Sequence, residues 1–482
     1  MSTYPVVVVG AGPVGVAVAT FIGQRGHRVL LLDRWEGVYP QPRAVHADDE
    51  VRRIIELLGV GAEFDAVSRP TLGLRLVDRE HRTLAEFERA GVNDHTGYPR
   101  AMLFDQPVLE KILRANLPPT VELRGGAEVT SVRQRVGEPV LVDYVEGGSS
   151  ITVAASYVVG ADGANSLVRE SIGAMMTHLG FEQRWLVVDI ETDAEFGHWD
   201  GVHQLCDSTR AETYMRVGPT RHRWEVRLRE GESAAQYCTV DRIRVLLRHW
   251  LAAAPEAELD LVRVADYTFR AEVADKWREG AVFLAGDAAH LTPPFIGQGL
   301  CAGLRDAANL GWKLAGVLDG RLDASVLDSY QAERAPHATV MVRLARLIGQ
   351  LMTGGGTGGD RIRRLVAPQL AWLPALHKPA HGSSTPRLSA SSLIHRSRLD
   401  RLAGTLAPEL GRESHGTWTL VTTDPAGVLP EALEGRVIRT RSGEPLHAWL
   451  GSGRTYSALV RPDSTVAATG AAIPELVAAI VR

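Results

Sequence analysis

Three segments far apart in the chain share one pattern, a short apolar run that ends in a glycine-rich turn. The first is VVVV at residues 6–9, followed by GAGPVG at 10–15 and an apolar stretch as far as Gly23. The second, YVVGADG, covers residues 157–163, and the third, VFLAGD, covers residues 282–287. Apolar runs of this length that end at glycine are typical of buried strands. Each segment has the composition of a nucleotide-binding turn, and we expect the three turns to build one site.

The first segment predicts strand, helix and strand over residues 5–33. In the G-x-G-x-x-G spacing, Gly10 gives a tight turn, Gly12 lets the backbone approach a pyrophosphate, and Gly15 lets helix and strand pack closely. The N-terminus of the helix offers free N–H groups and a partial positive charge to phosphate. Asp33, 18 residues after Gly15, ends the second strand, where a carboxylate can accept hydrogen bonds from ribose. These features predict dinucleotide binding.

A different pattern covers residues 183–270. WLVV at 185–188 is a buried-strand run, and RWEVRLR at 223–229 alternates strictly between apolar and charged residues. Such alternation is typical of an antiparallel sheet that covers something on one side. We therefore predict a sheet domain over residues 179–272, inserted into a nucleotide-binding domain that comprises residues 1–178 and 273–378.

In the remaining segments the hydrophobic pattern is mainly that of helices up to residue 350, and it is a mixture of strand and helix patterns after residue 393. Helices are predicted over residues 299–318, 325–350 and, inside the sheet domain, 241–253. Glycine-rich residues 354–359 and Ser/Pro-rich residues 379–392 read as breaks. A small α/β domain is predicted over residues 393–482, with strands at 417–422, 457–460 and 465–468 and a helix at 473–482.

Composition limits the class of protein. The 482 residues are too many for one core, and 45% hydrophobic with 23% charged residues is ordinary for a globular protein. A net charge of −4 gives no general attraction to nucleic acid or to an anionic membrane. The apolar stretch 6–22 has no basic residue before it, so we expect a cytoplasmic chain without a membrane segment. The three cysteines show no metal-ligand spacing, and we expect no metal site.

The three segments resemble those of the flavoprotein aromatic hydroxylases, the para-hydroxybenzoate hydroxylase-like class A monooxygenases. GAGPVG matches the family's first FAD motif, ADGANS at 161–166 with Arg169 matches its Asp-Gly motif, and GDAAH at 286–290 matches its Gly-Asp motif. GQGLCAGLRDAANL at 297–310 resembles the subgroup of 3-(3-hydroxyphenyl)propionate hydroxylase and the polyketide hydroxylases.

This resemblance implies an α/β fold with three parts: a Rossmann-like FAD-binding domain, an inserted antiparallel-sheet substrate domain and a C-terminal thioredoxin-like domain. It implies FAD as cofactor, NADPH or NADH as reductant, and O2 as co-substrate. A flavin C4a-hydroperoxide would then hydroxylate a phenolic or polycyclic aromatic substrate in a site that excludes water. No cysteine follows Cys301, so the C-terminal domain has no dithiol chemistry and serves a structural or oligomeric role, with a homodimer one possibility.

The glycines near residue 299 bring backbone close to the flavin. The N-terminus of the helix that begins there would favour an anionic reduced flavin by roughly 0.3–2 kcal/mol. The alternative is that these glycines only permit close packing. By resemblance, Arg43 and Gln106 contact FAD. The residues assigned to FAD are Gly10, Gly12, Gly15, Asp33, Arg34, Arg43, Gln106, Asp162, Asp287, Pro294, Gly297, Gly299 and Leu300.

Candidates for substrate contact and catalysis follow from position. His46 suits a general base because its unperturbed pKa is about 6.5, although a supporting role for this histidine stays open. Asp48 is a weaker candidate, with the N-cap of a helix as the alternative role. By resemblance, backbone at Pro293 and Pro294 approaches the substrate hydroxyl. His290 is expected to be structural, and no arginine stands out as a carboxylate anchor. Trp185, Tyr214 and Trp224 are proposed to line the pocket, with core packing as the alternative.

Other functions remain open from sequence alone. A flavin oxidoreductase or a Baeyer–Villiger-type oxygenase in natural-product tailoring would use the same fold. A non-catalytic nucleotide-binding protein is the alternative of another class. The sequence does not distinguish NADH from NADPH and does not identify the aromatic substrate.

Overall fold

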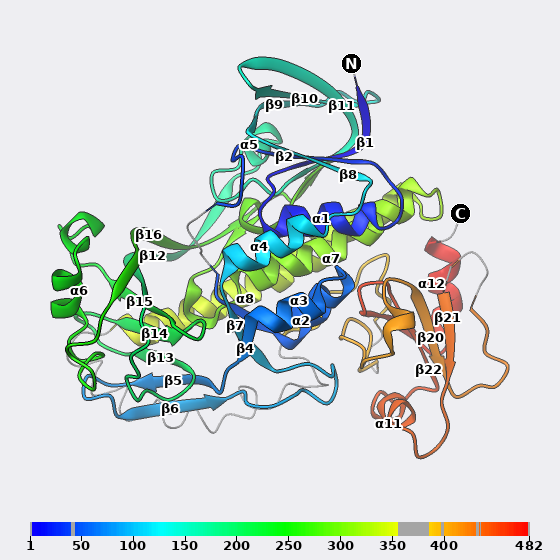
Figure 1. Cartoon of the computed structure of the whole chain (residues 1–482). Coiled ribbons are helices and arrows are strands. Elements are labelled where there is room, and N and C mark those ends of the chain that lie inside the picture. The colour runs from blue at the N-terminus through cyan, green and yellow to red at the C-terminus, as the bar shows by residue number, and fades with distance from the viewer. Residues whose placement is uncertain are drawn as a thin grey trace.

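The computed structural model describes residues 2–39, 44–354, 385–396, 400–429, 433 and 435–480. Figure 1 shows two large sheets with long helices between them, and a smaller C-terminal sheet (orange to red) beside the helices. The chain therefore combines a layered α/β body with a separate C-terminal unit.

The first sheet is built from the buried apolar runs. Five strands run parallel in the order β18-β11-β1-β2-β8. Strands β1, β2 and β18 and the end of β11 are almost completely buried, which explains why these runs are apolar without alternation. Antiparallel strands β17, β9 and β10 extend this sheet. The bounds are β1 Thr3–Val9, β2 Val29–Asp33, β8 Val121–Gly125, β9 Ala127–Arg133, β10 Val140–Glu146, β11 Ser149–Gly160, β17 Arg278–Glu279 and β18 Val282–Leu284.

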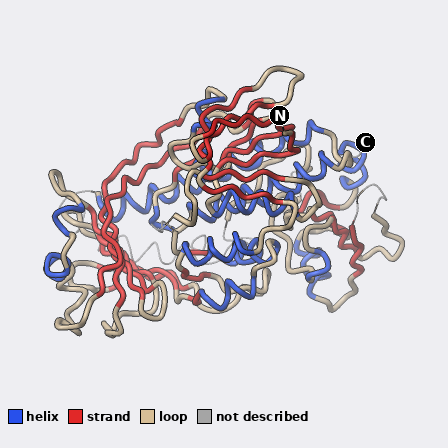
Figure 2. The backbone as a smooth tube through the Cα atoms, turned by 45° about the horizontal axis from the view of Figure 1, so that its top comes forward, coloured by secondary structure: helices blue, strands red, loops and turns tan. Residues whose placement is uncertain are grey.

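The second sheet has eight strands in the order β19-β16-β12-β15-β14-β13-β5-β6. All neighbours are antiparallel except the pair β13 and β5. Figure 2 shows its red strands at one end of the molecule, with helices between them and the first sheet. The bounds are β5 Gly73–Val77, β6 Thr83–Glu88, β12 Met176–Glu191, β13 Val202–Leu205, β14 Glu212–Arg216, β15 Arg221–Arg227, β16 Asp260–Ala274 and β19 His290–Leu291.

Two long helices, α7 (Gly299–Leu318) and α8 (Ser329–Thr353), pack against each other, and α1 (Pro13–Gly23) packs on α7. A three-stranded sheet lies beside them, with β3 (His46–Asp48) next to β7 (Ala101–Phe104) and β7 next to β4 (Ser68–Pro70). The short helices nearby are α2 Asp49–Leu57, α3 Gly61–Val67, α4 Gln106–Ala115, α5 Leu167–Ser171 and, on the second sheet, α6 Val240–Leu246.

The C-terminal unit is a four-stranded mixed sheet in the order β21-β20-β22-β23. A buried ion-pair group joins it to the helices: Arg461 lies 2.9 Å from Glu333 of α8, which also pairs at 2.9 Å with Lys313 of α7. The side chains of all three residues are fully buried, so loss of one partner would cost about 3–5 kcal/mol. The bounds are β20 Trp418–Thr422, β21 Gly435–Arg439, α11 Pro445–Ser452, β22 Ser457–Val460, β23 Val466–Thr469 and α12 Ala472–Ile480.

The predicted fold class is confirmed, with differences in detail. Helix α7 has the predicted bounds, whereas the helix predicted over 241–253 ends at Leu246. The second sheet also takes β5 and β6 from the chain before residue 179, where no strand was predicted. Residues 355–359 and 379–384 of the two predicted breaks lie outside the described residues. No helix within the described ranges is long and apolar enough to cross a membrane.

Candidate functional site

One cavity of about 800 Å³ lies between the two large sheets. The glycine turn after β1, the ends of β2 and β11, and the start of α7 form one wall. Strands β12 to β16 of the second sheet form the opposite wall, and α8 contributes Met341, Leu344 and Ile348. The three turns that the sequence singled out thus open into one space.

The glycines of the first turn have three different environments. Gly10 has φ +97°, and Gly15 packs so closely that a Cβ would lie 1.8 Å from the Gly10 carbonyl oxygen. A Cβ on Gly12, in contrast, would meet no atom within 4 Å, and Gly12 lines the cavity. Gly10 and Gly15 therefore serve the turn and its packing, while Gly12 leaves room for a ligand to approach the backbone.

Asp33 ends β2 at the edge of the cavity. Its carboxylate accepts hydrogen bonds from the backbone N–H groups of Ala11 (2.6 Å) and Trp35 (2.8 Å). Arg114 of α4 lies 3.6 Å from it and donates to the Ala11 carbonyl oxygen at 2.7 Å. The Arg114 Nε is buried and makes no hydrogen bond to any described residue. This cavity-lining arginine was not predicted, because nothing near it in the sequence resembles a nucleotide motif.

The second turn is held by its own side chains. Asp162 accepts hydrogen bonds from the Ser166 hydroxyl and the Val168 N–H, and Ser166 is the N-cap of α5. Burial raises the pKa of Asp162. Arg169 donates to the carbonyl oxygens of Ala164 (2.8 Å) and Ala288 (3.1 Å), which joins the second turn to the third.

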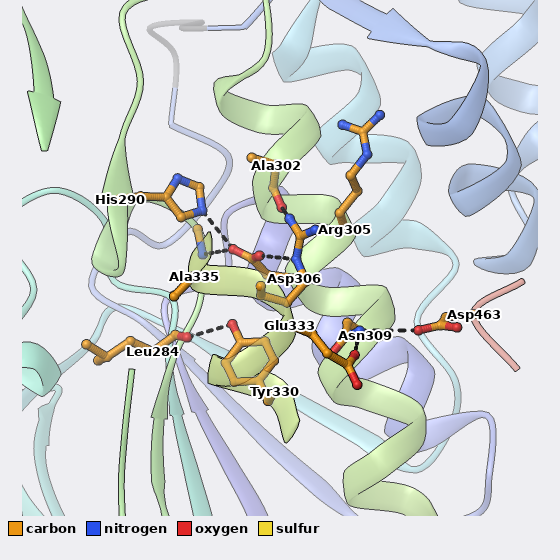
Figure 3. A network of polar contacts seen from close by, with 12 residues as sticks. Leu284, His290, Ala302, Arg305, Asp306, Asn309, Tyr330, Glu333, Ala335 and Asp463 are labelled. Carbon is orange, nitrogen blue, oxygen red and sulfur yellow. Dashed lines mark hydrogen bonds and ion pairs between the residues drawn. The ribbon is translucent and has the colours of Figure 1, made fainter. Parts of the chain in front are cut away.

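The third turn is fixed by a fully buried polar network, shown in Figure 3. Asp306 of α7 accepts from the Gly286 N–H at 3.1 Å, lies 2.8 Å from His290 and pairs with Arg334 of α8 at 2.8 Å. His290 has no exposed surface and does not line the cavity. Its contacts are those of a structural residue, as the sequence suggested.

The start of α7 sits directly under His46. Gly297 has φ +64°, and a Cβ there would lie 2.8 Å from the Cβ of His46. Asp48, in the same strand as His46, is the N-cap of α2, with Val51 N–H at 3.0 Å, and pairs with Arg305 at 2.6 Å. The N-cap alternative for Asp48 thus matches its geometry.

His46 itself is partly buried at the cavity wall, and its buried Nδ1 has no hydrogen-bond partner among the described residues. Burial, and next the positive charge of Arg89, lower its pKa to about 4. The ring is therefore neutral at pH 7. A histidine with this lowered pKa is a weaker base than the histidine of unperturbed pKa that was expected from the sequence.

The structure brings most of the predicted residues together. Gln106 lines the cavity while its side-chain oxygen accepts from the Ala44 N–H at 2.7 Å. Gly15, Pro293, Trp185, Tyr214 and Trp224 do not line the cavity, and Arg43 lies outside the described residues. Those that line it are Gly10, Gly12, Asp33, Arg34, His46, Gln106, Asp162, Asp287, Pro294, Gly297, Gly299 and Leu300.

The aromatic residues proposed for the pocket need correction, because side chains alternate between the faces of a strand. Tyr214 and Trp224 point to the face away from the cavity, where their rings lie 5.0 Å apart and pack with Trp250. Trp185 points toward the helices but is fully buried beneath Phe295, with ring centroids 5.5 Å apart. All three have the core role that was the alternative.

The polar positions of the second sheet face the cavity instead. Gln204, Thr213 and Glu225 line it from neighbouring strands, together with apolar Val187 and Met215. The alternation of β15 was visible in the sequence, but it did not say which face would meet the cavity. Arg89, in the loop after β6, also lines the cavity, and no sequence signal pointed to it.

The residues present fit an FAD cofactor. The open position above Gly12, the carboxylate of Asp33 and the start of α7 provide a backbone approach, a ribose acceptor and a helix N-terminus in one cavity. Its volume also lies within the range typical of ligand sites, about 300–1,000 Å³.

Comparisons with known proteins agree with this geometry. Residues 3–345 match the family model "FAD binding domain". The chain is 36% identical over 417 residues to a "Probable NADH-specific resorcinol 4-hydroxylase" of Rhodococcus jostii, covering 83% of this chain and 77% of the relative. It is 31% identical over 416 residues to a 3-(3-hydroxy-phenyl)propionate/3-hydroxycinnamic acid hydroxylase of Paraburkholderia xenovorans, covering 85% of this chain and 66% of the relative.

A solved structure covers nearly the whole chain. Aklavinone-11 hydroxylase, crystallised with FAD and aklavinone, superposes with a TM-score of 0.78 at 26% identity. The match covers 97% of this chain and 95% of that one.

Proposed function

The chain belongs to the FAD-dependent aromatic hydroxylases, and from this premise we propose that it hydroxylates a phenol that carries a carboxylate group. When bound, FAD takes electrons from a reduced nicotinamide and delivers one atom of dioxygen to the ring. The protein must hold both molecules together and keep water away from them.

The observation that carries this proposal is the cavity of about 800 Å³ between the sheets. The glycine turn, Asp33, Asp162 and Asp287 line the part that suits the nucleotide, and Gly297 to Leu300 approach the other part from α7. The second sheet closes this other part with Val187, Met215 and the neighbouring Phe295. Apolar walls of this kind exclude water around the reacting ring.

Arg89 supports the proposal that the substrate carries a carboxylate group. It lines the cavity, and its guanidinium makes no hydrogen bond or ion pair with any described residue. Its charge acts on His46, which lies against Gly297 at the start of α7. An arginine without a partner beside the reacting region is suited to a bidentate carboxylate. One relative is named for a phenylpropionate of this type and another for resorcinol, which has no carboxylate.

The test uses purified holoprotein with 3-(3-hydroxyphenyl)propionate and with resorcinol. We expect each phenol that binds to stimulate NADH or NADPH consumption and to gain one oxygen atom on a ring carbon, measured by mass spectrometry and NMR. A lactone product would favour the Baeyer–Villiger alternative. Nicotinamide oxidation that neither phenol stimulates would favour the oxidoreductase alternative.

Arg89→Gln separates the two substrate types. Removal of a charge-assisted contact costs about 1.5–3 kcal/mol, so KM for the carboxylate should rise roughly 10- to 100-fold. KM for resorcinol should stay within about twofold. Arg82→Gln, at the other end of β6 and with an exposed side chain, is the matched control. Equal effects of Arg89→Gln on both substrates would contradict the carboxylate role.

We also propose a cytoplasmic homodimer. The buried link between the C-terminal unit and the helices makes that unit a fixed surface suited to subunit contact. Light scattering of the holoprotein at micromolar concentration tests this, and a monomer would contradict it.

A further inference from the structure

We infer that the Glu225 carboxylate accepts the proton of the substrate hydroxyl, and that Thr213 and Gln204 hold that hydroxyl in place. In this step the phenolic O–H bond breaks, its proton passes to a Glu225 oxygen, and the electron pair stays on the phenolate oxygen. The inference rests on the proposed hydroxylation, because it assigns the group that prepares the ring for attack.

The three residues form one row across the cavity face of the second sheet. Gln204 of β13 is in register with Thr213 of β14, and Thr213 is in register with Glu225 of β15. All three line the cavity and are 1–6% exposed. Neighbouring strands lie about 4.8 Å apart, so the polar ends of the row are within reach of one phenol.

The row offers acceptors that lack donors. Gln204 donates its side-chain N–H to the Phe295 carbonyl oxygen at 2.5 Å, and its Oε1 is buried without a partner among the described residues. The Glu225 carboxyl group likewise makes no hydrogen bond or ion pair with any described residue. A buried acceptor without a donor costs about 1–3 kcal/mol. A hydroxyl donor from a ligand would remove this cost.

Gln204 also fixes the row relative to the start of α7. Phe295, its partner, lies between Pro294 and Gly297, both of which line the cavity. The row is therefore tied to the loop that by resemblance approaches the substrate hydroxyl.

A buried ion-pair group lies beside Glu225. Arg223 of β15 and Arg263 of β16 share Asp189 of β12, at 2.7 Å and 2.9 Å. Asp105 is the other carboxyl group that faces these arginines, and burial raises its pKa. The positive charges of Arg223 and Arg263 favour a negative charge nearby, on Glu225 before the proton moves and on the phenolate oxygen afterwards.

The shifts of the two candidate bases point in opposite directions. Burial raises the pKa of Glu225, although Arg223 opposes it, whereas burial and Arg89 lower the pKa of His46. Proton transfer from a phenol is easier when the pKa of the acceptor approaches that of the phenol. The protein environment therefore improves Glu225 as a base and weakens His46.

The experiment compares Glu225→Gln with wild-type holoprotein, using 3-(3-hydroxyphenyl)propionate and resorcinol as probes. Glutamine keeps the shape of the side chain but cannot take the proton. We expect the rate of ring hydroxylation in a single turnover to fall about 100-fold at pH 7, in the range that general bases contribute. The rate of flavin reduction should change less than twofold. Glu191→Gln, a half-exposed glutamate of the same sheet, is the matched control.

The pH profile distinguishes a base from a structural residue. As pH rises toward the phenol's own pKa of about 10, solvent ionises the ring and the variant should recover toward the wild-type rate. A loss that persists at high pH, or a rate at pH 7 within twofold of wild type, would overturn the inference.

Thr213→Val supplies a second measurement should Glu225→Gln fold poorly. It should weaken binding of the phenol about 3- to 10-fold without changing binding of the methyl ether of the same ring, measured by the change in flavin absorbance. Equal weakening of both ligands would overturn the inference. Wild-type protein that hydroxylates neither phenol would instead overturn the proposed function, and the inference with it.

Discussion

The two walls of the cavity are built on different principles. The parallel-sheet wall meets the cavity mostly with backbone, at turns where Gly10 and Gly297 pack closely against their neighbours and Gly12 leaves room for a ligand. The antiparallel wall meets it with side chains in a row, of which Gln204, Thr213 and Glu225 are the polar members. A backbone site depends on local sequence, whereas a side-chain site depends on which face of a sheet packs against the rest of the molecule.

This difference has a consequence for specificity. The turns can bind the same cofactor in every relative, because any sequence that folds into them offers the same N–H groups. The sheet face can change by single substitutions that leave the strands intact. Substitutions in β13 to β15 should therefore change the substrate preference of this chain, and substitutions in the turns should change its affinity for the cofactor.

The largest effect is expected for Gly15→Ala, which tests whether the backbone wall depends on close packing. The new Cβ would lie 1.8 Å from the Gly10 carbonyl oxygen, so the turn must shift. Overpacking of this kind should lower the free energy of unfolding by about 3 kcal/mol or more. Urea unfolding of the protein without added FAD measures this. Unfolding at the wild-type urea concentration would contradict the close packing.

Gly12→Ala in the same turn should give a smaller effect of another kind. Its Cβ meets no atom within 4 Å, so the free energy of unfolding should change by less than about 1 kcal/mol. The methyl group would occupy the approach to the pyrophosphate, and the Kd for FAD should rise about 10- to 100-fold. Flavin fluorescence titration measures this, with Gly451→Ala, another glycine without neighbours, as the control. An unchanged Kd would place the pyrophosphate elsewhere.

The backbone wall was predictable from sequence for a physical reason. The glycine spacing and the apolar runs encode turn geometry locally, so residues 10–15 and the bounds of α7 could be placed without knowledge of the rest. For Asp48 an N-cap role was the expected alternative to a weak candidate base, and for His290 a structural role was expected. The contacts of both side chains match these roles.

The side-chain wall was not predictable to the same degree. The alternation in β15 defined two faces, but both are buried, one against α6 and one at the cavity. Hydrophobicity favours the aromatic face as the substrate wall, which led to Tyr214 and Trp224. Only the packing of the whole sheet shows that Glu225 faces the cavity. Arg89 and Arg114 come from elements without any motif, so sequence alone gave no reason to choose them.

The smallest effect concerns the outer face of the second sheet, whose rings are buried away from the cavity. Burial lowers the pKa of His198 and of His222 to about 4, from the usual value of about 6.5. Between these values the unfolded chain binds protons that the folded chain does not, so stability is complete above about pH 6.5 and falls toward pH 4. Each of the two rings should lower the free energy of unfolding by about 1.4 kcal/mol when the pH falls from 7.5 to 5.5. His222→Gln, which removes one such ring, should therefore lose about 1.4 kcal/mol less than wild type over this interval, measured by urea unfolding at both pH values. Equal losses in the two proteins would mean that His222 is already solvated in the folded state, and the outer face would then be less tightly packed than the cavity face it supports.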